Sequence, residues 1–526
     1  MSDHSPSGGP LLAALDIGTN SFHLVVARAV GADRFETLTR EKEVVRLGHG
    51  GGDMKDLAPD AIERGLAALT RMRRIADSYD ARLRAVATSA VREAANAAVF
   101  LERARAEAGV EIDVISGIEE ARLIHLGVLQ AVPVFDQRVL LVDIGGGSTE
   151  LLIGERGDVL AARSLKLGAV RLTDRFFPDG HVTPKAVRAA RAHIRDLLTH
   201  FHRDVEIHGF AVAVASSGTA ETVARITHAA GGGPPLTTYN CATFGAGAVG
   251  AAVRELARHR RPETRVQVAG LEAARADIIV AGVLILDGVA AMYGVEEFTF
   301  SEAALRDGVL VDSLARSAGR DGAGHHHLRD ATARSIRQLA ERCDDDPRHS
   351  GHVAELAVQL FDGLHSLHGL NGAARDLLEA GAWLANVGLV VAHSKHHLHA
   401  YYVIRNSELA GLTDREIELI AQIARYHRKS APKANHEAFA ALSADDQTLV
   451  RTVAAILRVA IGLDRSHRSR VSAVRVTVGP KRVTVIVDAA PGPDRDVSLE
   501  LYAADERKPL LEDVLARKVD LVAADG

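Results

Sequence analysis

Two stretches of the sequence share one pattern: residues 12–26 read LAALDIGTNSFHLVV and residues 139–153 read VLLVDIGGGSTELLI. At a constant offset Asp16 matches Asp143, and the glycine and serine that follow also match. Each copy is an apolar run, a Gly-containing polar turn and a second apolar run, the pattern of a strand, a tight turn and a strand. Two such copies at domain-sized spacing predict two related half-domains.

Helical and strand patterns alternate between and after the two copies. Apolar residues at 62, 66, 69 and 72 recur at steps of four and three, which predicts one buried face of a helix. Further strands are predicted at 84–87 and 211–215, and further helices from Ser116, over 185–200 and from Ala220. Strands that alternate with helices indicate an α/β fold.

The composition of the sequence changes after residue 316. Residues 317–326 are Gly-rich and polar, which predicts a boundary, and the three histidines from His325 are interpreted as linker. Beyond it the sequence predicts an all-α domain and then a small α+β domain. The latter has a hairpin around Gly479, a third strand near 497–501 and a helix from Pro509. The predicted domains are 11–132, 133–316, 325–468 and 469–526.

Length and composition limit the class of protein. The chain has 526 residues, 47% of them hydrophobic and 25% charged, as in folded proteins of several domains. Its formal net charge of −5 predicts no nucleic-acid partner, and any polyanion must be held by a local basic patch. The sequence has two distant cysteines and no apolar run of the ~18–20 residues that cross a bilayer. We expect a cytoplasmic protein without a membrane span.

The two Gly-containing turns are candidate phosphate sites. Backbone N–H groups in such turns are unscreened by side chains and hold phosphate oxygens well. Carboxylates at either end of the second turn, Asp143 and Glu150, are suited to a hydrated Mg²⁺ that bridges to phosphate. A pair of hairpins without ligand is the alternative. The candidate phosphate-binding residues are Thr19, Asn20, Ser21, Gly145, Gly146, Gly147, Ser148 and Thr149.

These turns and other stretches resemble the exopolyphosphatase/guanosine pentaphosphate phosphatase family, within the actin–sugar kinase–heat-shock-ATPase superfamily. The matching stretches include ATSAVREAAN (87–96), ISGIEEARL (115–123), KLGAVRLTDRF (166–176), ASSGTAETVARI (215–226) and ALRDGVL (304–310). The resemblance implies two actin-like, ribonuclease H-like half-domains and Mg²⁺-dependent release of terminal orthophosphate from inorganic polyphosphate. Guanosine pentaphosphate is the alternative substrate, and an ATP-binding actin-like kinase or assembly protein is the alternative class. We expect a homodimer.

The same resemblance places the catalytic carboxylate in ISGIEEARL. It implies that Glu120 orients and partly deprotonates the attacking water. Glu119 is the rival, because successive helical residues point about 100° apart and only one of the two can face a cleft. Arg92 is expected to contact phosphate or to hold the glutamate.

The helical domain resembles HD-type phosphohydrolases, with His352 and Asp464 as candidate ligands. Active enzymes of that type need an adjacent His-Asp pair between these ligands. This sequence has Ala385 and Asn386 at that position, which are poor metal ligands, so we expect no catalysis there. A basic cluster in this domain is interpreted as a channel for long polyphosphate, with a solvated charged face as the alternative. The channel candidates are Lys395, Arg405, Arg428 and Lys429. A GxGxxG match at 245–250 is interpreted as a helix start and not as a dinucleotide site.

Overall fold

The computed structural model of the protein describes residues 9–30, 35–49, 55–232, 236, 238–318, 326–407, 409, 411–491 and 495–524. The chain divides into two compact units, Met1–Ala331 and Thr332–Gly526. The predicted boundary at 317–326 lies largely outside the described residues, as do the side chains of the histidine run.

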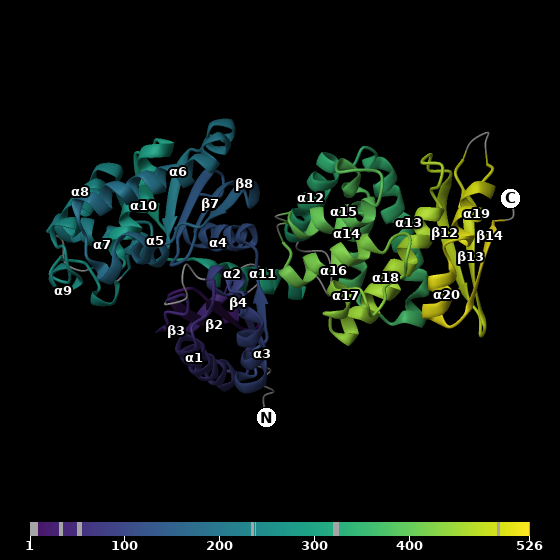
Figure 1. Cartoon of the computed structure of the whole chain (residues 1–526), viewed down its shortest axis with the longest axis horizontal. Coiled ribbons are helices and arrows are strands. Elements are labelled where there is room, and N and C mark those ends of the chain that lie inside the picture. Colours follow the sequence, from purple (N-terminus) through teal and green to yellow (C-terminus); the bar gives the residue numbers. More distant parts are fainter. Residues whose placement is uncertain are drawn as a thin grey trace, which may run out of the picture. The chain divides into compact units, whose positions relative to one another are not determined.

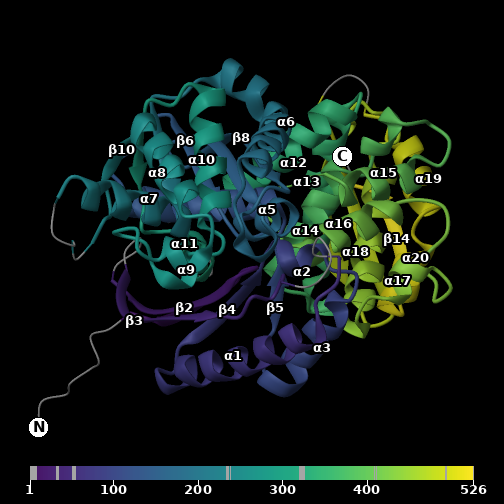
Figure 2. The same cartoon turned by 60° about the vertical axis from the view of Figure 1, so that its left-hand side comes forward.

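The first half-domain is built on a sheet of order β3-β2-β1-β4-β5. Strand β1 pairs antiparallel with β2 and parallel with β4, so the first repeat is a hairpin at the centre of the sheet. Helices α1 and α3 cover one face (Figures 1 and 2). The elements are β1 (Leu11–Ile17), β2 (Ser21–Ala29), β3 (Phe35–Val44), α1 (Pro59–Ser78), β4 (Arg82–Ala87), α2 (Ser89–Glu93), α3 (Ala97–Ala108) and β5 (Ile112–Val114).

The second half-domain repeats this arrangement in a sheet of order β10-β11-β9-β6-β7-β8. Strand β6 pairs antiparallel with β7 and parallel with β9, as β1 does with β2 and β4. The predicted pair of related half-domains is therefore confirmed. The strands are β6 (Val139–Ile144), β7 (Thr149–Glu155), β8 (Asp158–Leu165), β9 (Val212–Ser216), β10 (Thr243–Gly245) and β11 (Glu297–Phe300). The helices are α5 (Ala169–Phe176), α6 (Pro184–His208), α7 (Ser217–Ala230), α8 (Ala246–Arg258), α9 (Pro262–Arg265) and α10 (Ile279–Tyr293), with 3₁₀ turns at Pro178–Gly180 and Ala273–Arg275.

Two helices, α4 (Gly117–Ala131) and α11 (Leu305–Ala318), join the half-domains. One buried cluster combines Leu12 of the first sheet, Leu141 of the second, and residues of both helices. A β-carbon at Gly308 of α11 would collide with the carbonyl of Leu123 in α4, so glycine lets these helices approach closely. The predicted start of α4 is confirmed, since the Ser116 hydroxyl accepts a hydrogen bond from the Glu119 amide at 3.1 Å.

The GxGxxG match begins helix α8, as predicted. Its first glycine, Gly245, is the last residue of the short strand β10, which pairs antiparallel with β11. A dinucleotide-binding loop instead joins a parallel strand to its helix. Within the described residues, no helix is long and apolar enough to cross a membrane.

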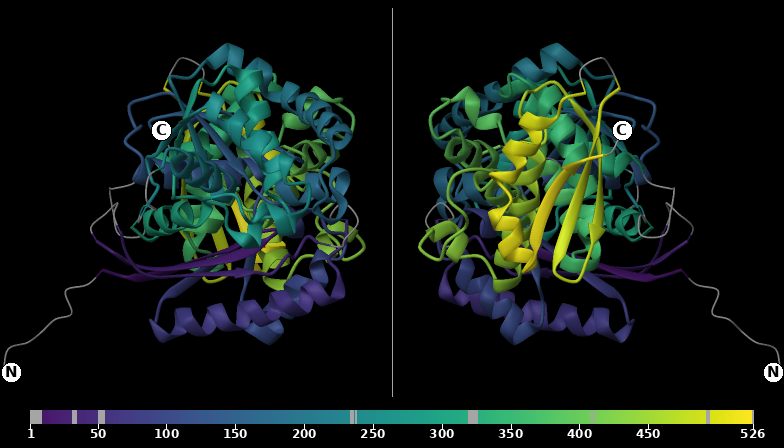
Figure 3. Two further views of the ribbon diagram at one scale, coloured as in Figure 1. Left: turned by 90° about the vertical axis from the view of Figure 1, so that its left-hand side faces the viewer. Right: turned by 90° about the vertical axis from the view of Figure 1, so that its right-hand side faces the viewer.

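The second unit consists of a helical bundle and a three-stranded sheet of order β12-β13-β14 (Figure 3). The predicted hairpin is confirmed as β12 (Val471–Val478) and β13 (Arg482–Ala489). The helices are α12 (His326–Cys343), α13 (Pro347–His368), α14 (Gly372–Trp383), α15 (His396–Arg405), α16 (Asp414–Arg425), α17 (Glu437–Ala440) and α18 (Ala444–Gly462), with a 3₁₀ turn at Val387–Val390.

The predicted third strand near 497–501 is wrong. Those residues begin helix α19 (Ser498–Asp505), because Glu500, Ala503 and Ala504 form a buried face at helical spacing. Ala504 packs so closely on Gly462 of α18 that a β-carbon there would collide with it. The helix predicted from Pro509 is confirmed as α20 (Pro509–Leu515), and the third strand is β14 (Lys518–Ala523), parallel to β13.

Candidate functional site

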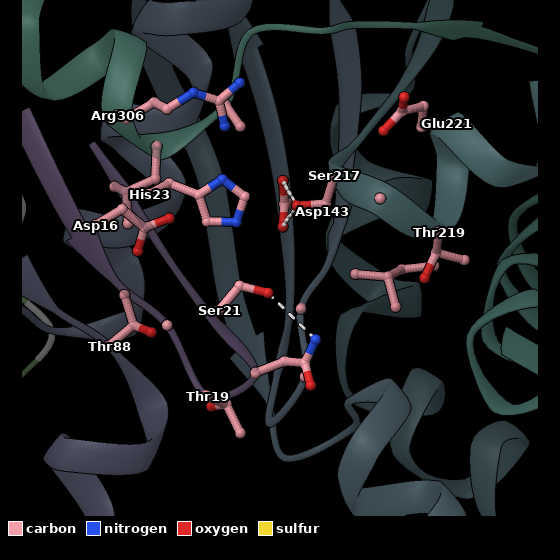
Figure 4. Close-up of a pocket in the computed structure, with 18 of the residues that line it drawn as sticks. Asp16, Thr19, Ser21, His23, Thr88, Asp143, Ser217, Thr219, Glu221 and Arg306 are labelled. Carbon is pink, nitrogen blue, oxygen red and sulfur yellow. Dashed lines mark hydrogen bonds between the residues drawn. The ribbon is translucent and has the colours of Figure 1, made fainter. Parts of the chain in front are cut away.

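A cavity of about 370 Å³ lies in the first unit, where the two repeat hairpins face each other. Figure 4 shows side chains from both half-domains that point into it. The lining includes the predicted residues Thr19, Asn20, Ser21, Glu120, Asp143, Gly145, Gly146 and Ser148. Five predicted residues of this unit, Arg92, Glu119, Gly147, Thr149 and Glu150, are not among the lining residues.

The two turns have the same backbone geometry and touch. The Gly18 amide donates to the Ser21 carbonyl at 3.2 Å, and the Gly145 amide donates to the Ser148 carbonyl at 3.0 Å. A β-carbon at Gly146 would lie 3.1 Å from the β-carbon of Thr19. Glycine at position 146 therefore lets the second turn approach the first.

Helix α5 supports the second turn from behind. The amides of Ala169 and Val170 donate to the carbonyls of Gly145 and Gly146 at 2.9 and 2.8 Å. The Thr149 hydroxyl donates to the Leu167 carbonyl and is fully buried. The structure thus gives Thr149 a supporting place beside the cavity.

The N-terminus of helix α7 supplies cavity residues that sequence reasoning did not assign. Ser217, Gly218 and Thr219 line the cavity, and Ser217 has a left-handed backbone with φ of 68°. The amides of a helix N-terminus favour phosphate. The signal for these residues was the run SSGT at the end of the predicted strand at 211–215.

The structure separates the two adjacent glutamates. Glu119 is 1% exposed, and its carboxylate accepts two hydrogen bonds of 2.7 Å from Arg122, which also binds Asp312. Glu120 lines the cavity instead. Its carboxylate accepts a 3.1 Å hydrogen bond from Arg92, which also donates to the Ile115 carbonyl at 2.9 Å. Arg92 is outside the cavity lining, so this geometry favours its role in holding Glu120.

Four carboxylates converge near the hairpins, of which Glu120, Asp143 and Glu150 are buried and Asp16 is half-buried. Burial raises the pKa of Glu120 to about 7 against the effect of Arg92. Burial, then repulsion by Glu120, raises the pKa of Asp16 to about 8. The pKa of Glu150 lies well above its usual range for the same reasons, with Asp143 adding repulsion. Sequence reasoning did not assign Asp16 to the site, although it is the repeat partner of Asp143.

This carboxylate set fits a hydrated divalent cation. One carboxylate oxygen of Glu150, Oε2, is buried and has no hydrogen-bond partner among the described residues, while Oε1 accepts from Ser164 at 2.7 Å. Both oxygens of Asp143 accept from Ser217 at 2.8 and 2.9 Å, and one also accepts from Ser216. The described residues form no ready group of three or more ligands, so a water shell would have to complete the coordination.

Four cations also line the cavity, although the charge of the whole chain is negative. Sequence reasoning placed the basic cluster in the second unit and missed these residues. One of them, Arg306, occurs in ALRDGVL, a stretch that carried the resemblance. The lining cations are Arg40, Lys42, Arg275 and Arg306.

The second unit contains the basic cluster that the sequence predicts. Arg405 is held by Asp414 at 3.0 Å and by Glu418 at 2.7 Å, which removes it from the cations available to a polyanion. Lys395 and Lys429 are exposed. Burial, then the charges of Arg465 and Arg428, lower the pKa of Arg507, so these three guanidiniums repel one another. Arg465 and Arg507 therefore add to the cluster around Arg428.

Beside Asp464 the structure places His349 and not the predicted His352. His349 Nδ1 lies 2.8 Å from Asp464 Oδ2, and Asp464 is fully buried. His352, the predicted ligand, lies 3.9 Å from Glu355. Ala385 is buried and Asn386 precedes the 3₁₀ turn at Val387–Val390, and neither is a usual type of metal ligand.

Comparison with known proteins identifies related sequences and structures. Residues 25–317 match the model of the Ppx/GppA phosphatase family, and residues 331–490 match Ppx/GppA phosphatase, domain III. An exopolyphosphatase from Cytophaga hutchinsonii is 29% identical, with a TM-score of 0.54 over 58% of this chain and 97% of that chain. A Ppx/GppA family member from Aquifex aeolicus is 26% identical, with a TM-score of 0.51 over 60% of this chain and 99% of that chain.

The family model covers more than half of the chain, including the second repeat hairpin and the segments that carry Glu120 and Arg306. The solved structures agree with the two actin-like halves described above. This chain belongs to the Ppx/GppA phosphatase family.

Proposed function

We propose that the protein is an exopolyphosphatase, which releases orthophosphate from the end of inorganic polyphosphate. The observation that carries the proposal is the position of Glu120. Its buried carboxylate faces a cavity bounded by two phosphate-type turns and a helix N-terminus. The name of the Cytophaga hutchinsonii relative supports the same activity.

In the proposed reaction a water oxygen attacks the terminal phosphorus. Glu120 takes the water proton, and a pKa of about 7 suits a base that works near neutral pH. The bond from that phosphorus to the bridging oxygen breaks, and the bridging oxygen leaves with the electron pair as the new end of the shortened chain. Arg92 keeps Glu120 oriented through its 3.1 Å hydrogen bond. Positioning and charge stabilisation account for most of the catalysis of such transfers.

A divalent cation, Mg²⁺ in our proposal, would supply positive charge against the phosphate oxygens when bound. Asp143 and Glu150 would hold its water shell, with Asp16 on the opposite hairpin. Burial is the main cause of the raised pKa values of Asp16 and Glu150, and repulsion by Glu120 and Asp143 adds to it, so a bound cation would relieve both effects.

The lining favours polyphosphate over guanosine pentaphosphate. Among the described lining residues, the only phenylalanine, tyrosine or tryptophan is Phe300, which is 2% exposed and offers little surface for a base to stack on. The described lining instead has eight hydroxyl side chains, seven carboxylates and four cations, and its hydroxyl groups and cations recognise phosphate and not a purine. Initial rates of phosphate release from both substrates test this preference, and a higher kcat/KM on guanosine pentaphosphate would reverse it.

A further inference from the structure

We propose that Arg306 contacts the phosphoryl group under attack and offsets the charge that develops on its oxygens. This inference rests on the proposed phosphoanhydride hydrolysis and assigns a residue to it. Arg306 lies in the first turn of α11, the helix shared by the two half-domains. Figure 4 shows its guanidinium in the cavity on the same side as His23.

The arginine is anchored but keeps donors for a ligand. Its side chain is 16% exposed, with Nε 3.6 Å from Asp307 Oδ2. Its Nη2 donates to the Glu302 carbonyl at 3.2 Å. A guanidinium has five N–H donors in a rigid fork, so these contacts do not exhaust it. Such a held, partly buried fork is suited to a phosphate.

Arg306 faces both hairpins at once. It lines the same cavity as Asp16 of the first hairpin and Asp143 of the second. The terminal phosphoryl group must lie between these hairpins to reach both phosphate turns and Glu120. Arg306 therefore faces the place where negative charge develops.

The other cations are less suited to this role. Arg92 is bound to Glu120 and is outside the lining. Arg40 is 48% exposed and lies 3.8 Å from Asp307. Lys42 and Arg275 lie close to each other and to Glu221 and Glu272, and these carboxylates offset part of their charge.

The test compares Arg306→Gln and Arg306→Lys with Arg188→Gln, which removes the same charge from an exposed position on α6. With tripolyphosphate as substrate we expect kcat to fall about 10²-fold in Arg306→Gln, the usual cost of one transition-state donor. The lysine variant should recover part of this loss because it keeps the charge. Arg188→Gln should match the wild type.

Two binding measurements separate a phosphate contact from a structural role. Loss of Arg306 should weaken tripolyphosphate binding, measured by calorimetry in the Glu120→Gln background. The same loss should tighten Mn²⁺ binding, measured by electron paramagnetic resonance without substrate, by about threefold to tenfold, the scale of one screened charge interaction. A misfolded site would weaken both.

Mn²⁺ affinity that stays unchanged or falls, or tripolyphosphate affinity that stays unchanged, would overturn the assignment of Arg306. If the wild type releases no phosphate from any polyphosphate, the proposed function fails. The two binding measurements then still decide whether Arg306 contacts the anion, since neither needs turnover.

Discussion

Replacing Glu119 and Glu120 separately by glutamine should give opposite results on stability and activity. The two side chains are adjacent in sequence and both buried, at 1% and 7% exposed, so the pair is a matched comparison. Glu119→Gln weakens the buried contact with Arg122 and leaves that arginine with Asp312. Removing one partner of a buried ion pair costs about 3 kcal/mol or more.

Glu120→Gln should stabilise the first unit at high pH. The pKa of Glu120 rises from 4.5 to about 7, and one pKa unit corresponds to about 1.4 kcal/mol. Because the folded state holds its proton to higher pH than the unfolded state, stability falls as pH rises from 4.5 through about 7. Above that range the ionised carboxylate costs folding about 3 kcal/mol, and glutamine removes this cost.

Differential scanning calorimetry of the full chain at pH 8 in EDTA measures both effects. The only tryptophan, Trp383, lies in the second unit, so its fluorescence identifies the transition that belongs to that unit. At about 2 °C per kcal/mol for a large domain, the first-unit transition should rise by several degrees in Glu120→Gln and fall by several degrees in Glu119→Gln. At pH 5 the gain in Glu120→Gln should shrink to less than about 1 kcal/mol.

The effects of the two substitutions on activity should be the reverse of their effects on stability. We expect kcat to fall at least ~10²-fold in Glu120→Gln, the scale of general-base catalysis, and to stay near normal per folded molecule in Glu119→Gln. Normal turnover in Glu120→Gln together with loss in Glu119→Gln would refute the assignment. A destabilised Glu120→Gln would refute the electrostatic reasoning.

Three further changes test the turns, the metal and the basic cluster. Gly146→Val should raise KM strongly with a smaller effect on folding, because its side chain would separate the second turn from Thr19; an unchanged KM would mean that the turns need not touch. Asp143→Asn and Glu150→Gln should both raise the Mg²⁺ concentration for half-maximal rate, and unchanged titrations in both would remove the metal from this loop. Neutralising Lys395, Arg428 and Lys429 together should weaken binding of long polyphosphate and flatten its dependence on KCl, as for other polyanions. Arg405→Gln is the matched control, since Asp414 and Glu418 already hold that cation. Equal losses on short and long substrates would exclude a channel.

The repeat made much of the site predictable. Once residues 12–26 and 139–153 were aligned, hairpins at the centre of two sheets followed from the strand pattern, and the turns between them became candidate phosphate sites. The same alignment already contained Asp16 as the partner of Asp143. The sequence pattern predicts metal-holding carboxylates only at the ends of the glycine-rich copy, so it does not predict a role for Asp16.

Other features of the site and the fold depend on contacts between residues that are distant in sequence, and local patterns do not predict them. Helical periodicity shows that only one of Glu119 and Glu120 faces a cleft, but the choice is made by Arg122 and by Asp312, 190 residues away along the chain. Arg306 enters the site because α11 packs against α4. A contact between distant residues also explains the misassigned strand near Val497. Its residues alternate as in a strand, but they form a helix because Ala504 packs against Gly462.

The measurement that tests the central claim most directly is phosphate release in H₂¹⁸O with Mg²⁺, from polyphosphate, guanosine pentaphosphate and ATP side by side. We predict that polyphosphate gives the highest kcat/KM, that each released orthophosphate carries one ¹⁸O from the attacking water, and that Glu120→Gln abolishes the release. Turnover of ATP alone, or release from polyphosphate that survives Glu120→Gln, would contradict the account.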